Sequence, residues 1–193
     1  MSNKVVHKIS STVLVLCASI IPVAASAQTG MTSGSAQLFL GAKALDSYWE
    51  PADEQGEIGI QFDFRNEYWP FGFTFGLYSG SGESDPAGVL ETETTELQFG
   101  LKKIWDVTHA VHFSLGGGLT FASLEVSSPP LSVTEKDTGL GVWFSGAVYW
   151  TIGQNFDLGL QMMASGAEGE YVFGTETAEI GGGHFGFIVG THW

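Results

Sequence analysis

The chain has 193 residues, with 7 basic and 21 acidic side chains and a formal net charge of −14. This balance argues against nucleic acid as a partner, because binding to phosphates needs cationic side chains. The 27 glycines follow no three-residue period, which excludes a collagen-like chain, and the length suits one domain.

The first 27 residues have the pattern of a cleaved export signal. Lys4 and Lys8 form a basic start, an apolar segment covers 13–23, and Ala25-Ser26-Ala27 supplies small residues for cleavage. The apolar segment is too short for a membrane-spanning helix. Cleavage there leaves 166 residues with 5 basic against 21 acidic side chains, a charge of about −16, and removes the only cysteine, Cys17. An exported chain without disulfides needs another source of stability.

Eight later segments alternate apolar and polar residues with the period of two that identifies β-strands. The clearest is 57–65, which has apolar residues at 58, 60, 62 and 64. The others lie at 38–44, 71–78, 95–101, 111–121, 140–150, 156–162 and 185–193. In the first segment Phe39 and Leu45 interrupt the alternation, because both fall on the polar face. Eight strands of about ten residues match a membrane-crossing barrel.

The connections between these segments alternate in length. Short ones fall at 66–70, 103–109 and 151–155, and long ones at 46–56, 79–91, 126–137 and 168–178. Most acidic residues lie in or beside the long segments, Glu57 and the run Glu91–Glu96 among them. Four tryptophans fall on the short-turn side, as expected for an aromatic girdle at a lipid headgroup level: Trp69, Trp105, Trp150 and Trp193.

The final segment, Phe185–Trp193, is a strand with one apolar face that ends on an aromatic residue. With the export signal and the eight segments, it makes the chain resemble the small eight-stranded outer-membrane barrels of the OmpX/OmpW-like, opacity-protein and OmpA-barrel type. Trp193 stands where phenylalanine is commoner in that group.

The resemblance covers 36–193 and implies an all-β, antiparallel, up-and-down transmembrane barrel in the outer membrane of a Gram-negative bacterium. The implied organisation is a signal peptide at 1–27, a short periplasmic tail at 28–35 and a barrel at 36–193. The first and last strands are expected to pair and close the barrel. The resemblance also implies that the barrel-assembly machinery reads the Phe185–Trp193 strand.

The polar faces of the strands are expected to line the lumen. They carry mixed charges, which are costly against lipid and can pair in a narrow interior: Lys43, Asp63, Arg65, Glu96 and Lys102. A soluble lipocalin-like barrel would instead keep its large apolar residues inside. The same faces are rich in glycine, which either makes room for large side chains such as Tyr78 and Trp143 or leaves a narrow passage. Eight-stranded barrels are usually filled by side chains, so a filled lumen is favoured.

The sequence predicts no catalytic site, no metal site and no cofactor. His112 and Ser114 are weak candidates, since an imidazole two residues from a hydroxyl on one strand face could activate it. The pair resembles the His-x-Ser-Asn motif of PagL-type lipid A deacylases, but Leu115 stands in place of the asparagine. Its register places it in the lumen near the short turns, which favours a hydrogen-bond network. Calcium at Glu91–Glu96 is disfavoured, because the carboxylates divide between two faces.

The predicted function is therefore a monomeric outer-membrane barrel that presents acidic surface loops. A structural, adhesion or envelope-stability role without catalysis is expected. The expected partners are outer-membrane lipid and lipopolysaccharide, the barrel-assembly machinery, and an extracellular protein or cell surface. A narrow channel for small solutes and a lipid A-modifying enzyme remain as alternatives.

Overall fold

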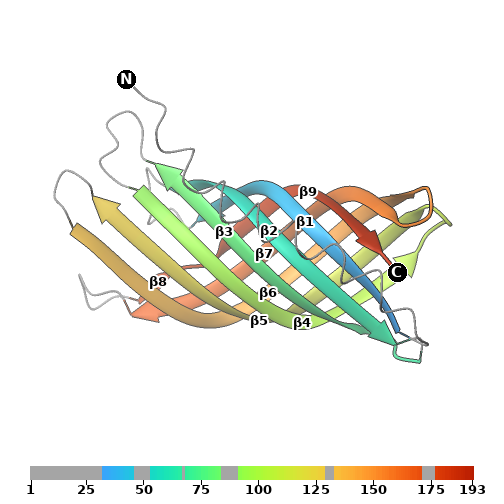
Figure 1. Ribbon diagram of the computed structural model, residues 1–193. Helices are drawn as coiled ribbons and strands as arrows, with labels where there is room; N and C mark the ends of the chain where they lie inside the picture. The colour runs from blue at the N-terminus through green and yellow to red at the C-terminus, as the bar shows by residue number, and fades with distance from the viewer. Residues whose placement is uncertain (1–31, 46–52, 67, 84–90, 129–132, 171–176) are drawn as a thin grey trace, which may run out of the picture.

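The computed structural model describes residues 32–45, 53–66, 68–83, 91–128, 133–170 and 177–193, whose regular structure is entirely β-strand (Figure 1). In chain order the strands are β1 (Thr32–Leu45), β2 (Glu54–Asn66), β3 (Gly72–Glu83), β4 (Glu91–Asp106), β5 (Val111–Ser128), β6 (Val133–Ile152), β7 (Phe156–Glu170), β8 (Thr177–Glu179) and β9 (Gly182–His192). Among these residues, no helix has the length and apolar character needed to cross a membrane.

The strands form one closed antiparallel barrel. Each strand from β1 to β7 pairs with the next along the chain, and β9 closes the ring between β7 and β1. The short β8 continues β9, because Glu179 pairs with Glu168 and Gly182 with Ser165 in a single register along β7. Nine labelled elements therefore make eight barrel strands. The predicted eight-stranded, up-and-down fold, with its first and last strands paired, is confirmed.

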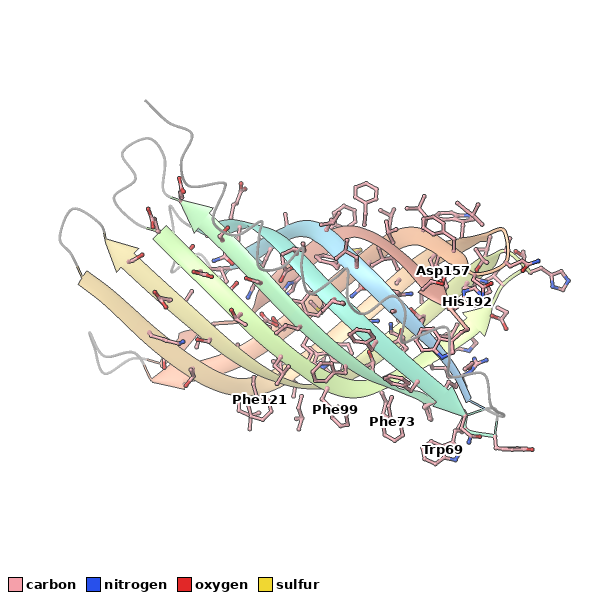
Figure 2. The ribbon with its side chains drawn as sticks, viewed as in Figure 1. Trp69, Phe73, Phe99, Phe121, Asp157 and His192 are labelled. Carbon is pink, nitrogen blue, oxygen red and sulfur yellow. The ribbon has the colours of Figure 1, made fainter. Side chains whose placement is uncertain are left out.

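The period of two sorts side chains between the outside of the barrel and its lumen. In β3, Phe73, Phe75 and Leu77 are 39–41 % exposed, while Thr74 and Tyr78 between them are almost fully buried. Figure 2 shows aromatic side chains that point outward from β3, β4 and β5 and from the turn before β3: Trp69, Phe73, Phe99 and Phe121. So large a continuous apolar exterior would promote aggregation in water and suits a hydrocarbon environment.

The short connections gather at one end of the barrel (Figure 1). The tryptophans of the predicted girdle belong to the same end. Trp69 lies between β2 and β3, Trp105 and Trp150 lie close to the ends of β4 and β6, and Trp193 follows β9. The turn between β6 and β7 is tight because Gly153 adopts a φ of 71°, which a side chain would disfavour. The predicted position of all four tryptophans is confirmed.

On the opposite side, the strands run beyond the ends that alternation predicted. β3 reaches Glu83 and β4 begins at Glu91, while β5 reaches Ser128 and β6 begins at Val133. Residues 79–83 and 91 of the predicted loop 79–91, and residues 126–128 and 133–137 of the predicted loop 126–137, are therefore strand. Threonine, serine and glycine in these extensions carry no apolar period, yet their backbones continue the ladder, and β-branched threonine favours it. Residues 46–52, 84–90, 129–132 and 171–176 lie outside the described residues.

The barrel also begins earlier than its predicted boundary at 36. β1 starts at Thr32, which pairs with Asn66 of β2. Ser33, Gly34 and Ser35 have no apolar alternation, so they were assigned to the tail at 28–35. The predicted signal peptide at 1–27 lies outside the described residues.

Candidate functional site

Large side chains occupy the middle of the lumen. Phe39, Tyr78 and Trp143 are each at most 2 % exposed and belong to one apolar cluster with Ile188 and Met163. The rings of Phe39 and Tyr78 meet edge to face, with centroids 5.7 Å apart. Because these residues come from β1, β3, β6, β7 and β9, they fill the lumen from several sides. Phe39, which interrupts the sequence alternation, is thus part of the lumen core.

Inward glycines make room for these rings. A Cβ at Gly59 would lie 2.2 Å from Cδ1 of Tyr78, and one at Gly100 would lie 2.8 Å from Cζ2 of Trp143. Both distances are too short for two carbon atoms, so the neighbouring ring could not stay where it is. Of the two explanations for the glycine-rich lumen, room for large side chains is the one that this packing supports.

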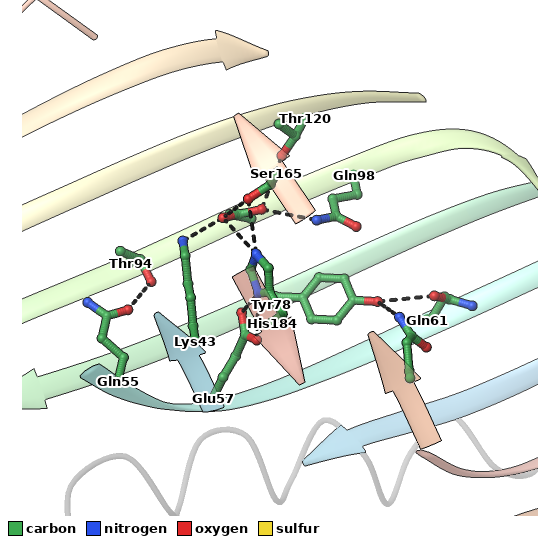
Figure 3. A network of polar contacts seen from close by, with 12 residues as sticks. Lys43, Gln55, Glu57, Gln61, Tyr78, Thr94, Gln98, Thr120, Ser165 and His184 are labelled. Atoms are coloured by element: carbon green, nitrogen blue, oxygen red, sulfur yellow. Dashed lines mark hydrogen bonds and ion pairs between the residues drawn. The ribbon is translucent and has the colours of Figure 1, made fainter. Parts of the chain in front are cut away.

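The lumen charges that the sequence assigned to the interior form ion pairs. The Lys43 ammonium contacts Glu96 Oε1 at 2.5 Å, and both side chains are at most 1 % exposed (Figure 3). Ser165 donates to the same oxygen at 2.9 Å, while Gln98 and Thr120 donate to Oε2 at 3.0 and 3.4 Å. A buried carboxylate needs such compensation, since an unpaired one carries a large desolvation penalty.

His184 joins this cluster from β9. Its Nδ1 lies 2.7 Å from Oε2 of Glu57, and its Nε2 lies 3.0 Å from Oγ of Ser165 and 3.7 Å from Oε1 of Glu96 (Figure 3). Glu57, which the sequence grouped with the loop acids, is thus buried in the lumen, as is Glu96. Lys43, Glu57, Glu96, Ser165 and His184 together are called the lumen network below.

Ser165, His184 and Glu57 have the connectivity of a hydroxyl nucleophile, a general base and an orienting carboxylate. The Ser165 hydroxyl, however, donates a hydrogen bond to Glu96, and all three residues are buried. A nucleophile must reach an acyl carbon, which this packed environment does not accommodate. The arrangement binds β2, β4, β7 and β9 together and does not present a reactive hydroxyl.

A second polar chain runs from the middle of the lumen towards the short turns. Tyr78 donates to Oε1 of Gln61 at 3.0 Å, and the amide of Gln61 donates to Asp63 at 3.2 Å. Asp63 also accepts from Lys102 at 2.8 Å and from Ser35 at 2.9 Å. The predicted pairing of mixed lumen charges therefore holds for both lysines and both of the acids named with them.

The short-turn mouth contains a cavity of about 150 Å³, lined by residues of β1, β2, β4, β5, β6, β7 and β9. Two histidine–aspartate pairs lie at its edge. His112 Nδ1 is 2.7 Å from Asp106 Oδ1, and His192 Nδ1 is 2.9 Å from Asp157 Oδ2. Figure 2 shows the second pair at this end of the barrel. We call this space the short-turn cavity.

His112 and Ser114 both point into the lumen from β5, as their register predicts. His112 pairs with Asp106 and stacks on Tyr149, with ring centroids 5.1 Å apart. Ser114 is 2 % exposed. Within the described residues, no hydrogen bond joins His112 to Ser114. The structure therefore places the two weak candidates on one face without assembling them into a reactive pair.

The outer face of the barrel wall is acidic at its long-loop end. Five glutamates line a cavity of about 450 Å³ there: Glu54, Glu83, Glu91, Glu93 and Glu125. They come from β2, β3, β4 and β5, which the strand extensions carry to this end. In the part of the chain that the structure describes, no group of three or more histidine, cysteine or acidic residues is placed to hold a metal ion. These five glutamates are called the acidic rim.

Sequence reasoning missed the lumen network around His184. It assigned no role to His184, and it placed Glu57 beside a loop. The available signal was the register: Glu57, Lys43 and His184 all fall on polar faces. Their contact depends on which strands face each other across the lumen, which a single sequence does not state.

No protein-family model matches the chain, and comparison with curated proteins finds no related sequence. Among solved structures, neisserial surface protein A matches with a TM-score of 0.59 and 11% identity, covering 83% of this chain and 96% of that one. OprG of Pseudomonas aeruginosa matches with a TM-score of 0.59 and 8% identity, covering 84% and 96%.

The attachment invasion locus protein Ail of Yersinia pestis matches with a TM-score of 0.56 and 8% identity, covering 86% of this chain and all of that one. Ail has also been solved with the heparin analogue sucrose octasulfate. At these identities the similarity concerns the fold. Together with the closed eight-stranded ring and the apolar exterior, it shows that this chain has the fold of the small eight-stranded outer-membrane β-barrel proteins.

Proposed function

We propose that this chain is an integral outer-membrane barrel that acts at the cell surface without catalysis or solute transport. The filled lumen is the observation that carries the proposal. Phe39, Tyr78 and Trp143 are packed together in its middle, and buried ion pairs lie beside them. A water-filled passage would instead leave the inward side chains hydrated.

Conductance tests the proposed absence of transport. The refolded chain, reconstituted in a planar bilayer, is expected to give no discrete conductance steps. Slower gel migration after boiling, the usual sign of a folded barrel, verifies folding, and protease protection in vesicles verifies insertion. Discrete steps from protein that passes both checks would contradict the filled lumen and favour the narrow-channel alternative.

The acidic rim supports a role in attachment to positively charged surfaces. Its five carboxylates gather at the end of the barrel that, by the resemblance, lies on the extracellular side of the membrane. Lys136 is an exposed cation beside them on β6. Complementary charge directs encounter and partner choice. A sulfated sugar such as the one bound by Ail has the wrong charge for this rim. We therefore propose a cationic partner, such as a basic protein segment.

Neutralising part of the rim tests this proposal. The variant Glu83→Gln/Glu93→Gln/Glu125→Gln, in neutral-lipid nanodiscs, is expected to bind an oligolysine peptide about tenfold more weakly than the unmodified barrel. Three exposed charge pairs at roughly 0.5 kcal/mol each give that ratio. Oligoglutamate serves as the control peptide and is expected to bind neither protein. Equal oligolysine affinity for both barrels would contradict a role for the rim.

The remaining partners follow from the same location. We propose that the apolar exterior contacts outer-membrane lipid and lipopolysaccharide, that the barrel-assembly machinery recognises Phe185–Trp193, and that the barrel is a monomer. Support comes from the exposed apolar belt, from the position of β9 as closing strand, and from the ring being complete within one chain.

A further inference from the structure

We propose that the short-turn cavity binds a small oxyanion, either a carboxylate or a phosphate, through the guanidinium of Arg65 and the hydroxyl of Tyr149. The cavity lies at the end of the barrel opposite the acidic rim and has no part in the surface role proposed above. The inference rests on an account of which polar groups in the cavity already have partners.

Each of the three aspartates that line the cavity has at least one hydrogen-bond partner. Asp63 accepts from Lys102 and Ser35. Asp106 lies 2.7 Å from His112 Nδ1. Asp157 accepts from the Thr151 hydroxyl at 2.8 Å and lies 2.9 Å from His192 Nδ1. Asp63 and Asp157 therefore have at least two partners each, whereas Asp106 has one and its side chain is 69 % exposed.

Two strong hydrogen-bond donors that line the same cavity have no acceptor among the described residues. Among the described residues, the guanidinium of Arg65 makes no ion pair or hydrogen bond, and the hydroxyl of Tyr149 makes no hydrogen bond. Arg65 is partly buried at the inward face of β2, and Tyr149 is held by stacking against His112. Donors without acceptors favour a ligand rich in acceptor oxygens.

The chemistry of these donors specifies an oxyanion. A guanidinium offers parallel N–H groups that match two oxygens of a carboxylate or phosphate, and a phenol adds a third donor. The cavity of about 150 Å³ exceeds by roughly tenfold the ~10–15 Å³ that a single water needs. It therefore has room for a small anion with its remaining hydration.

Charged groups of both signs surround the two donors. The charged and titratable groups facing the cavity are Asp63 and Arg65 on β2, Lys102 and Asp106 on β4, His112 on β5, Tyr149 on β6, Asp157 on β7 and His192 on β9.

The test is a titration of the refolded full-length mature barrel in a maltoside detergent, which contains no phosphate or carboxylate. Inorganic phosphate and, separately, acetate are added while NMR chemical shifts are followed. Saturable shifts at residues lining the cavity are expected. The anion that saturates at lower concentration identifies the preferred oxyanion class.

Variants separate a built site from general charge attraction. Arg65→Gln is expected to weaken binding about tenfold or more, since a charge-assisted hydrogen bond contributes roughly 1.5–3 kcal/mol. Lys103→Gln removes the same charge from the outer face of β4, where Lys103 lies over Phe71 and Trp105, and is expected to bind as the unmodified barrel does.

Tyr149→Phe keeps the stacked ring and removes only the hydroxyl. It is expected to weaken binding several-fold, from the roughly 1 kcal/mol of a neutral hydrogen bond, and it preserves the test if Arg65→Gln does not fold. Absence of saturable shifts with either anion would overturn the proposal. Equal affinities of the folded Arg65→Gln and Lys103→Gln barrels would overturn it as well.

Discussion

Replacing Lys43 by methionine is expected to lower the free energy of unfolding by about 3–5 kcal/mol, because it leaves a buried carboxylate without its cation. Lys43 and Glu96 are in contact and at most 1 % exposed, so water cannot take the place of the lost ammonium. His184, which also faces Glu57, is 3.7 Å from Glu96 and cannot fully compensate. Urea-induced unfolding of the refolded barrel in lipid vesicles measures the change.

Two further variants identify the cause of that loss. The double variant Lys43→Met/Glu96→Gln removes both charges and is expected to be more stable than Lys43→Met alone, because no uncompensated carboxylate remains. Lys136→Met removes a cation from an exposed position on β6 and is expected to cost less than about 1 kcal/mol. If all three variants lost the same stability, the ion pair would not be the source of the effect.

Replacing Trp193 by aspartate is expected to impair barrel closure and to reduce the yield of folded protein sharply. The backbone N–H of Trp193 donates to the carbonyl of Gly34 at 2.9 Å, and Trp193 accepts in return at 3.0 Å. Its indole lies against Gly34, where a Cβ would come within 2.5 Å of Cζ2. Truncating a half-buried aromatic at this seam is expected to cost about 2 kcal/mol or more, and a new charge at the interface adds to it.

The yield of folded protein in the outer membrane, measured from heat-modifiable gel mobility, tests this expectation. Trp193→Phe keeps an aromatic residue and is expected to assemble at close to the normal level. Gly34→Val, which leaves the terminal residue unchanged but displaces the indole, is expected to lower the yield as well. Normal assembly of Trp193→Asp would show that the terminal aromatic has no role in closing the barrel.

The wall of the barrel was predictable because the residues that identify its lipid-facing side are close together in the sequence. Alternation of apolar and polar residues in 57–65 and 71–78 identifies the lipid-facing side without reference to any other strand. The tryptophans at 69, 105, 150 and 193 similarly mark one membrane interface from their position beside short turns. At Glu91 and Glu93 the outward residues are polar, so the apolar alternation that marks a strand is absent there. For that reason the sequence predicts shorter strands than the structure has.

The contents of the lumen were less predictable because they depend on pairs that are distant in sequence. The sequence assigned Lys43 and Glu96 to the interior, but only the barrel brings these residues, 53 positions apart, into contact. It offered two explanations for Gly59 and Gly100, and the positions of Tyr78 and Trp143 decided between them. The cavity that Arg65 lines likewise depends on residues of β1, β2, β4, β5, β6, β7 and β9.

The sequence by itself determined the eight alternating strands, the apolar exterior and the end at which the tryptophan girdle lies. The export signal is a prediction from the same sequence. Those features arise from residues two positions apart or from turns between neighbouring strands. Only the tertiary structure decided that Phe39 belongs to the lumen core, that Glu57 and His184 pair there, and that the short-turn cavity holds donors without acceptors. Closing the sheet sets which strands face each other across the lumen, and that relation is carried by no local pattern in the chain.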